Sequence, residues 1–202
     1  MELVIYLEGD ADIRFLEDFV AYHFPDKKEH VSFINVGGKT SLPSKKKDLE
    51  EDSFNDRKSI IIFDADDTSK PNGGKEASLT FLQNELEKIN ISHIENEDIF
   101  LFPNHNEEGD LETLLEKLIP EDKLDVLNCF SSFQICLEAV KDNFNPPLNV
   151  PINKTKMYSY EDVLGTNRKK CAESNRSYLT DHWDLEAESA KPLYDFLEKY
   201  LT

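Results

Sequence analysis

The chain has 202 residues, of which 39% are hydrophobic and 32% are charged, and its formal net charge is −18. This length is enough for one α/β domain with a helical extension, and the apolar runs are strand-sized and far too short to span a membrane. The negative charge counts against a general DNA-binding protein, because phosphates are repelled unless positive charge gathers locally or a divalent metal ion bridges the two.

The first quarter of the chain begins with a strand signal followed by a helix signal. Residues 3–7, "LVIYL", form a continuous apolar run typical of a strand buried in a parallel sheet. A helix is expected from about residue 10 to residue 24, and Pro25 ends it. A second strand over residues 31–36 stops at the glycine pair Gly37–Gly38.

The same alternation continues after a lysine-rich segment that is predicted to be partly helical. Residues 59–63, "SIIIF", are the most strand-like run in the chain. A turn-rich loop then leads to a helix over roughly residues 75–90, and "DIFLF" at 98–102 is a fourth strand. The leucines of residues 111–118 predict another helix.

From about residue 121 the strand signals cease. Helical periodicity covers residues 122–141 and 186–201, with a proline- and asparagine-rich break between them. The pattern predicts an α/β core over residues 1–120 with a mostly parallel, four-stranded sheet flanked by helices. Residues 121–202 are expected to form a helical C-terminal extension packed on that core as a single structural unit.

The amino terminus and the cysteines indicate the compartment. No basic residue precedes the first apolar run, so it is read as neither a signal nor a transit peptide. The three cysteines are an odd number without metal-ligand spacing, which favours reduced thiols in a cytoplasmic protein. Cys129 and Cys136 lie one heptad apart on a predicted helix face.

Acidic residues follow the predicted strands at the positions where a parallel sheet binds ligands, namely the carboxyl ends. Glu8 follows the first strand, and Asp64 and Asp66 follow the third. Carboxylates packed together repel one another and stay protonated unless a cation neutralises them. Mg²⁺ or Mn²⁺, which prefer oxygen ligands, are the natural cofactors. Helix capping and loop solvation are the alternative explanation for each acid taken alone.

Three sequence stretches together resemble the Toprim domain, the topoisomerase–primase fold. They are "YLEGDADIRFL", "GGK" and "IIIFDADD", and the resemblance covers roughly residues 2–118. Two further stretches, "LFPNHNEEGDLETLL" and "HWDLEAESAKPLYDFL", are similar to an uncharacterised bacterial family of Toprim-like proteins. That family is related to nucleases of the overcoming-lysogenization-defect type. The resemblance implies a Toprim, Rossmann-like sheet.

The resemblance also implies roles for particular residues. Glu8 matches the Toprim glutamate, a general acid/base or metal ligand. Asp64 and Asp66 match the Asp-x-Asp pair that holds Mg²⁺ for phosphoryl transfer on nucleic acid. Asp12 matches an acid that often follows at the start of the first helix. Apart from the resemblance, Asp67 is an accessory candidate because it also follows the third strand.

The glycine turn and nearby basic residues are the expected substrate-binding elements. "GGKT" is not a Walker P-loop, because Phe33 stands where that motif needs its first glycine. Gly37 and Gly38 are instead expected to bring backbone N–H groups and Lys39 to the rim of the acidic site. Lys75 is expected to bind substrate, and His105 is an accessory candidate because of its loop position.

Three functions remain open at this point. The first is a Mg²⁺-dependent, nuclease-like protein acting on nucleic acid, for instance in phage defence, although the net charge weakens the case for a nucleic-acid partner. The second is a non-enzymatic Toprim-like binding module. A protein partner or a homodimer also fits, and DNA and RNA are not distinguished.

The third function is a haloacid-dehalogenase-like phosphohydrolase. "DADDT" fits the Asp-x-Asp-x-Thr signature of that class, with Asp64 as nucleophile and Asp66 as general acid. The motif normally ends the first strand of its fold, whereas two strands precede it here. The distal Gly-Asp-x-x-x-Asp partner is also missing, since Leu114 stands where its second aspartate belongs.

Overall fold

The computed structural model of the chain describes residues 2–165 and 175–202, and it contains one four-stranded, all-parallel sheet. The strands are β1 (Leu3–Leu7), β2 (Val31–Asn35), β3 (Lys58–Asp64) and β4 (Ile99–Phe102). Their order is β2-β1-β3-β4, so β1 and β3 are the central pair. The predicted α/β fold with a mostly parallel, four-stranded sheet is therefore confirmed. The third cysteine, Cys171, lies outside the described residues.

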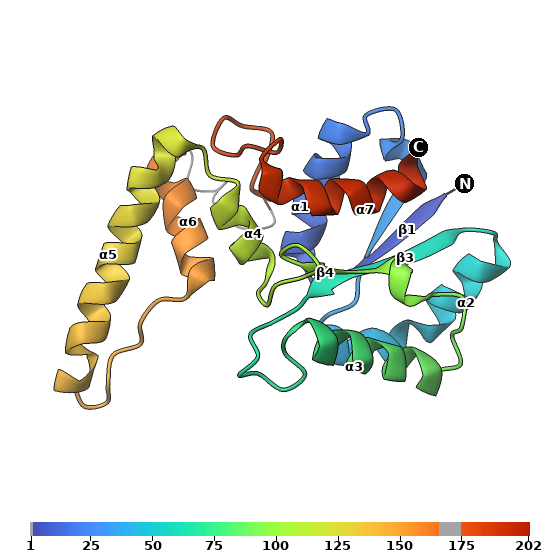
Figure 1. The fold of residues 1–202 in the computed structure, drawn as a ribbon, viewed down its shortest axis with the longest axis horizontal. Coiled ribbons are helices and arrows are strands. Elements are labelled where there is room, and N and C mark those ends of the chain that lie inside the picture. The colour runs from blue at the N-terminus through green and yellow to red at the C-terminus, as the bar shows by residue number, and fades with distance from the viewer. Residues whose placement is uncertain (1, 166–174) are drawn as a thin grey trace.

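Helices connect and flank the strands (Figure 1). The α-helices are α1 (Asp10–His23), α2 (Lys46–Phe54), α3 (Lys75–Lys88), α4 (Leu111–Lys117), α5 (Leu124–Val140), α6 (Asn153–Leu164) and α7 (Lys191–Leu201). Short 3-10 helices cover Lys28–His30, Lys39–Lys45, Asn96–Asp98, Glu121–Lys123, Lys141–Asn143 and Glu188–Ala190. Within residues 2–165 and 175–202, no helix combines the length and apolar character that crossing a membrane requires.

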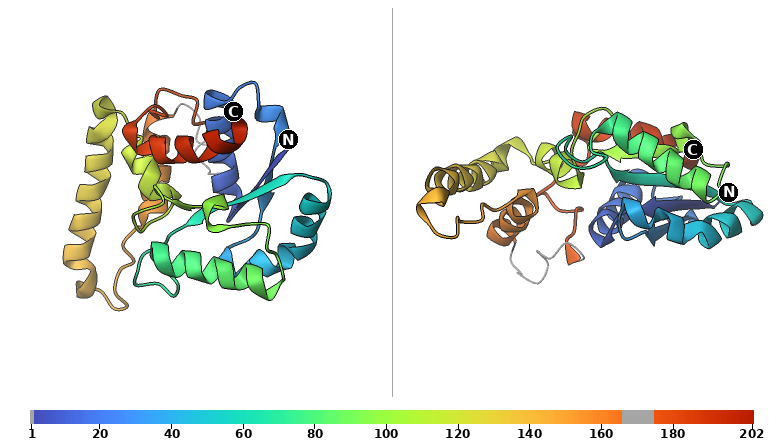
Figure 2. Two further views of the ribbon diagram at one scale, coloured as in Figure 1. Left: turned by 45° about the vertical axis from the view of Figure 1, so that its right-hand side comes forward. Right: turned by 90° about the horizontal axis from the view of Figure 1, so that it is seen from below.

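The sheet is buried on both faces, which explains why its strands read as continuous apolar runs. Successive strand residues point to opposite faces, so Leu3, Ile5 and Leu7 join one core while Val4 and Tyr6 join the other. The first core packs against α1, α4 and α7, and the second packs against α2 and α3 (Figure 2). The sheet is therefore the middle layer of three.

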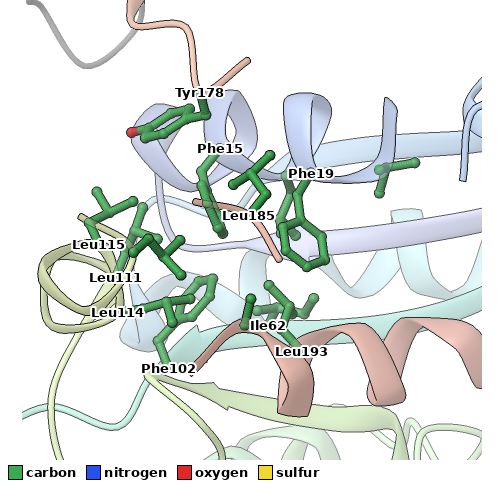
Figure 3. Packing of buried hydrophobic residues seen from close by; sticks show 14 of the residues in the cluster. Phe15, Phe19, Ile62, Phe102, Leu111, Leu114, Leu115, Tyr178, Leu185 and Leu193 are labelled. Carbon is green, nitrogen blue, oxygen red and sulfur yellow. The ribbon is translucent and has the colours of Figure 1, made fainter. Parts of the chain in front are cut away.

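The larger core contains residues from both ends of the chain (Figure 3). The Phe15 ring of α1 meets Phe102 and Tyr178 edge-on, with ring centroids 6.2 and 5.1 Å away. The Tyr178 backbone N–H also donates to the Asp18 carboxylate at 2.7 Å. Because Tyr178 is anchored in this way, the segment before α7 is part of the core.

The two predicted C-terminal helices exist, but they lie in different places. The helix predicted over residues 186–201 begins as a 3-10 turn, becomes α7 at Lys191 and lies on the sheet through Leu193 and Leu197. The helix predicted over residues 122–141 is α5, which lies with α6 beside the sheet layers (Figure 1). The sequence did not predict α6, because its apolar positions have little periodicity.

Candidate acidic site

A pocket of about 540 Å³ lies at the carboxyl ends of the central strands β1 and β3. Its lining residues are Glu8, Gly9, Asp10, Ala11, Asp12, Asp64, Glu112 and Lys154. The acids come from four separate parts of the fold: the end of β1, the first turn of α1, the end of β3 and the first turn of α4. The pocket thus gathers negative charge from residues far apart in sequence.

Glu8 and Asp64 are held next to each other by the pairing of β1 with β3. The backbone N–H of Asp64 donates to Glu8 Oε1 at 3.1 Å. Burial raises the pKa of the Glu8 carboxyl, and this outweighs the opposing effect of that hydrogen bond. Glu8 and Asp64, which were both predicted from the ends of the strands, therefore lie at one site.

Asp64, at the end of β3, is a second pocket acid with a raised pKa. Its Oδ1 accepts a hydrogen bond from the backbone N–H of Leu111, the first residue of α4, at 3.1 Å. Burial raises the pKa of Asp64 well above its ordinary value, and the charges of Asp12 and Glu8 raise it further. A carboxylate in this position gains strongly from a nearby cation.

Asp12 belongs to the same pocket and is almost completely buried. Its Oδ2 accepts from the backbone N–H of Gly9, the N-cap residue of α1, at 2.8 Å. Burial raises the pKa of Asp12 to about 7, and the negative charges of Glu8 and Glu112 act in the same direction. This accessory candidate therefore lies inside the pocket.

Sequence reasoning missed three charged pocket residues, Asp10, Glu112 and Lys154. Glu112 is 7% exposed and stands in the first turn of α4, two residues after the N-cap Asp110. The acid-rich loop after β4 was the available signal, but helix capping explained it equally well. Lys154 comes from α6, which was not predicted. Its positive charge opposes the rise in the pKa of Asp12 that burial causes.

Asp66 is directed to a different set of partners. Its carboxylate accepts from Lys39 Nζ at 2.5 Å and from Lys70 Nζ at 2.8 Å, and Asp66 does not line the acidic pocket. Burial acts to raise the pKa of Asp66, but the hydrogen bonds from the two lysines outweigh it and lower the pKa. The neighbouring Asp67 is exposed and accepts from the backbone N–H of Ser69.

The glycine turn supports Glu8 through the backbone. Gly37 and Gly38 have φ values of +80° and +98°, in the left-handed region that favours glycine. Both N–H groups donate to the backbone carbonyl of Glu8, at 3.0 and 3.1 Å. These predicted substrate-binding groups are therefore occupied within the chain, and Lys39 beyond them contacts Asp66 and Ser78.

The last two candidates, Lys75 and His105, do not line the pocket either. Lys75 begins α3, and its Nζ lies 3.4 Å from Asn106 Oδ1. His105 Nδ1 accepts from the backbone N–H of Leu101, and its ring stacks on Phe100. Burial lowers the pKa of His105, which favours its neutral form in this structural role.

The chemistry of the pocket fits a hard divalent ion that keeps much of its water. Among the described residues, no three His, Cys, Asp or Glu side chains form a group that could hold a metal ion together. One oxygen each of Glu8, Asp12 and Asp64 is oriented by a backbone N–H. Mg²⁺ usually binds through one or two carboxylates and retains several waters, so its requirements match this set of donors.

The fold and site define an α/β protein with an acidic pocket at the carboxyl edge of a parallel sheet. Over residues 2–202 the chain matches, and belongs to, the family described as "Protein of unknown function (DUF3226)". No curated protein matches it. Among solved structures it is similar to the C-terminal region of the Burkholderia pseudomallei OLD protein, with 15% identity and a TM-score of 0.49, covering 99% of this chain and 98% of the other.

Proposed function

We propose that the protein carries out metal-dependent phosphoryl transfer on nucleic acid and is nuclease-like. One observation carries the proposal: five acidic side chains from four parts of the fold line one pocket at the carboxyl edge of the sheet. They are Glu8, Asp10, Asp12, Asp64 and Glu112. The raised pKa values of three of these acids reflect burial and mutual repulsion, which a bound cation relieves.

Glu8 and Asp64 are the residues that would hold Mg²⁺ or Mn²⁺. When bound, such an ion would polarise a phosphoryl oxygen and stabilise the negative charge that develops there. Asp12 and Glu112 complete the acidic wall. Lys154 lines the same pocket and is suited to orient a phosphate through a charge-assisted hydrogen bond.

We assign Asp66 a positioning role. It fixes the ammonium groups of Lys39 and Lys70, and Lys39 is only 9% exposed. This gathers positive charge beside the acidic pocket in a chain whose overall charge repels phosphate. A nucleic-acid backbone would approach along Lys70, whose side chain is 59% exposed.

The pairing of Asp66 argues against the haloacid-dehalogenase-like alternative. In that class the second aspartate donates a proton, so it must be protonated at the working pH. Two lysine hydrogen bonds lower the pKa of Asp66 and keep it ionised. The non-enzymatic binding module remains the second candidate, because an acidic pocket can hold a metal ion without turnover.

The test is cleavage of supercoiled DNA, single-stranded DNA and RNA with Mg²⁺ or Mn²⁺. Removing a group that holds metal or moves a proton typically costs about 10²–10⁴ in rate, so Glu8→Gln and Asp64→Asn should both lose activity to that extent. Asp67→Asn is the matched control, since Asp67 is exposed in the same loop and does not line the pocket.

Two outcomes would overturn the proposal. If none of these substrates is cleaved while Mn²⁺ still binds at the pocket, the binding module is the correct reading. If a small phosphomonoester is hydrolysed by Glu8→Gln but not by Asp64→Asn, the phosphohydrolase is correct.

A further inference from the structure

Helix α5 presents an uncovered apolar face. Residues 126–137 contain no charged residue, although 32% of the whole chain is charged. Of the α5 side chains only Leu127 is buried, whereas Phe133 is 50% exposed, Val140 is 37% exposed, and Cys129 and Cys136 are exposed. The helix lies at the outer edge of the molecule, away from the sheet (Figures 1 and 2).

The apolar residues of this face follow a coiled-coil pattern. Val126, Cys129, Phe133, Cys136 and Val140 recur at alternating spacings of three and four residues. We call these five residues the α5 seam. Such a spacing is typical of a helix that packs against another helix along its length.

Helix α6 lies along one side of α5 and borders the α5 seam. Gln134 donates from Nε2 to the carbonyl of Pro151 at 2.6 Å, at the start of the segment that leads into α6. The groove between the helices, about 460 Å³, is lined by α5 and α6 residues that are mostly apolar. Val126, Cys129 and Phe133 of the α5 seam line this groove. Val126 is half-buried, and the other four residues of the seam remain exposed.

We propose that α5 pairs with α5 of a second copy of this chain, antiparallel and about a two-fold axis at Phe133. The α5 seam is close to palindromic about that residue, since Val126 and Val140 lie seven positions on either side. Each valine would pack against the other valine of the partner, with the two Phe133 rings at the centre. A two-fold contact of this kind is self-complementary.

The charges at the helix ends select the antiparallel arrangement. Asp125 and Lys141 lie eight positions on either side of Phe133, so an antiparallel pair brings Asp125 of each copy to Lys141 of the other. A parallel pair would instead oppose Asp125 with Asp125 and Glu138 with Glu138. Lys141 also pairs with Glu138 of its own helix, so its charge is shared between the two acids.

The net charge of the chain explains why this face suits a second copy. Two copies that each carry −18 repel one another, and close contact is least costly where charge is absent. A basic partner would be drawn to the acidic surfaces rather than to an uncharged stretch of helix. The α5 seam combines absence of charge with apolar exposure.

The size of the seam sets the expected affinity. Fourteen residue steps from Val126 to Val140 span about 21 Å, at about 1.5 Å per residue. A standard protein–protein interface buries about 800 Å² of surface on each partner, and one helix face of this length buries less. We therefore expect a reversible dimer in the micromolar range, and salt should strengthen it by screening the repulsion.

Sedimentation equilibrium under reducing conditions, from about 1 to about 200 µM protein, tests this. The wild-type chain should shift from monomer to dimer, and Phe133→Glu should remain monomeric throughout. Phe54→Glu is the matched control, because Phe54 is 88% exposed on the distant helix α2. A wild-type chain that stays monomeric, or a Phe133→Glu variant that still dimerises, would overturn the proposal.

A charge exchange tests the orientation and does not alter the apolar seam. Asp125→Lys alone should weaken the dimer about 5- to 10-fold, because it places two positive charges opposite each other. Adding Lys141→Asp should restore the affinity. If the double variant is no tighter than Asp125→Lys, the antiparallel register is wrong. The experiment uses no metal ion, so its outcome is independent of the proposed function.

Discussion

Asp64 and Asp66 are two residues apart, yet they lie in opposite electrostatic environments. Asp64 faces other acids and has a raised pKa, whereas Asp66 is held by two lysines and has a lowered pKa. The cause is local: β3 ends at Asp64, and Asp66 has a φ of +60°. A strand-like Asp-x-Asp would point both carboxylates to one side, so the turn after the strand decides which acid belongs to the pocket.

The two aspartates of one Asp-x-Asp motif therefore have to be assigned their roles separately. The acidic pocket stores unfavourable repulsion that a cation would relieve, whereas the charge of Asp66 is already balanced by lysines of the chain itself. The two sides should therefore respond differently to pH, to metal and to loss of charge.

The largest expected difference is in the pH dependence of stability. The pKa of Asp12 is about 7 in the folded chain and close to 3.8 when unfolded, so the native state keeps a proton that the unfolded state releases. The free energy of unfolding should therefore fall as pH rises from about 4 to about 7, by up to about 4 kcal/mol. Denaturant titrations without metal, from about pH 4 to about pH 8, measure this fall.

Asp12→Asn is the variant that isolates this effect. Other groups titrate in the same range; burial lowers the pKa of His23 and His105, for example, which opposes the trend at acidic pH. The difference between the wild-type chain and Asp12→Asn removes such contributions. If that difference does not change between about pH 4 and about pH 8, Asp12 does not titrate as proposed.

The second difference is in the response to metal. Mg²⁺ or Mn²⁺ at 100 times its Kd should stabilise the chain by about 2.7 kcal/mol, which corresponds to a Tm rise of about 5–10 °C. Asp64→Asn and Glu8→Gln should lose this rise, whereas Asp66→Asn should keep it. Thermal unfolding with and without metal measures the response. If Asp66→Asn abolishes the rise, Asp66 is a metal ligand, as the Toprim resemblance implies.

Much of this arrangement could be predicted from the sequence, because buried parallel strands have a clear apolar signature and end at a common edge. Glu8 and Asp64 follow from that rule alone. The direction of Asp66 does not, since apolar periodicity says nothing about the backbone conformation of a turn. Lys154 could not be predicted as a pocket residue either. Its helix α6 buries only a few side chains, such as Met157 and Tyr160, and so lacks the apolar periodicity of an amphipathic helix.

The smallest expected difference is in stability at constant pH without metal. Asp66→Asn leaves Lys39 nearly buried without its carboxylate partner, so the free energy of unfolding should fall by about 1–2 kcal/mol. Asp64→Asn removes a repelling charge, so it should leave stability unchanged or raise it. Asp67→Asn, the exposed control, should stay within about 0.5 kcal/mol of wild type. Urea unfolding of the three variants gives the values.

Lys39→Met combined with Asp66→Asn should recover part of the loss, because neither partner is then left buried and unpaired. An Asp66→Asn variant as stable as the wild-type chain would mean that the lysine pair contributes nothing to the fold, and the contrast between the two aspartates would then be confined to metal binding.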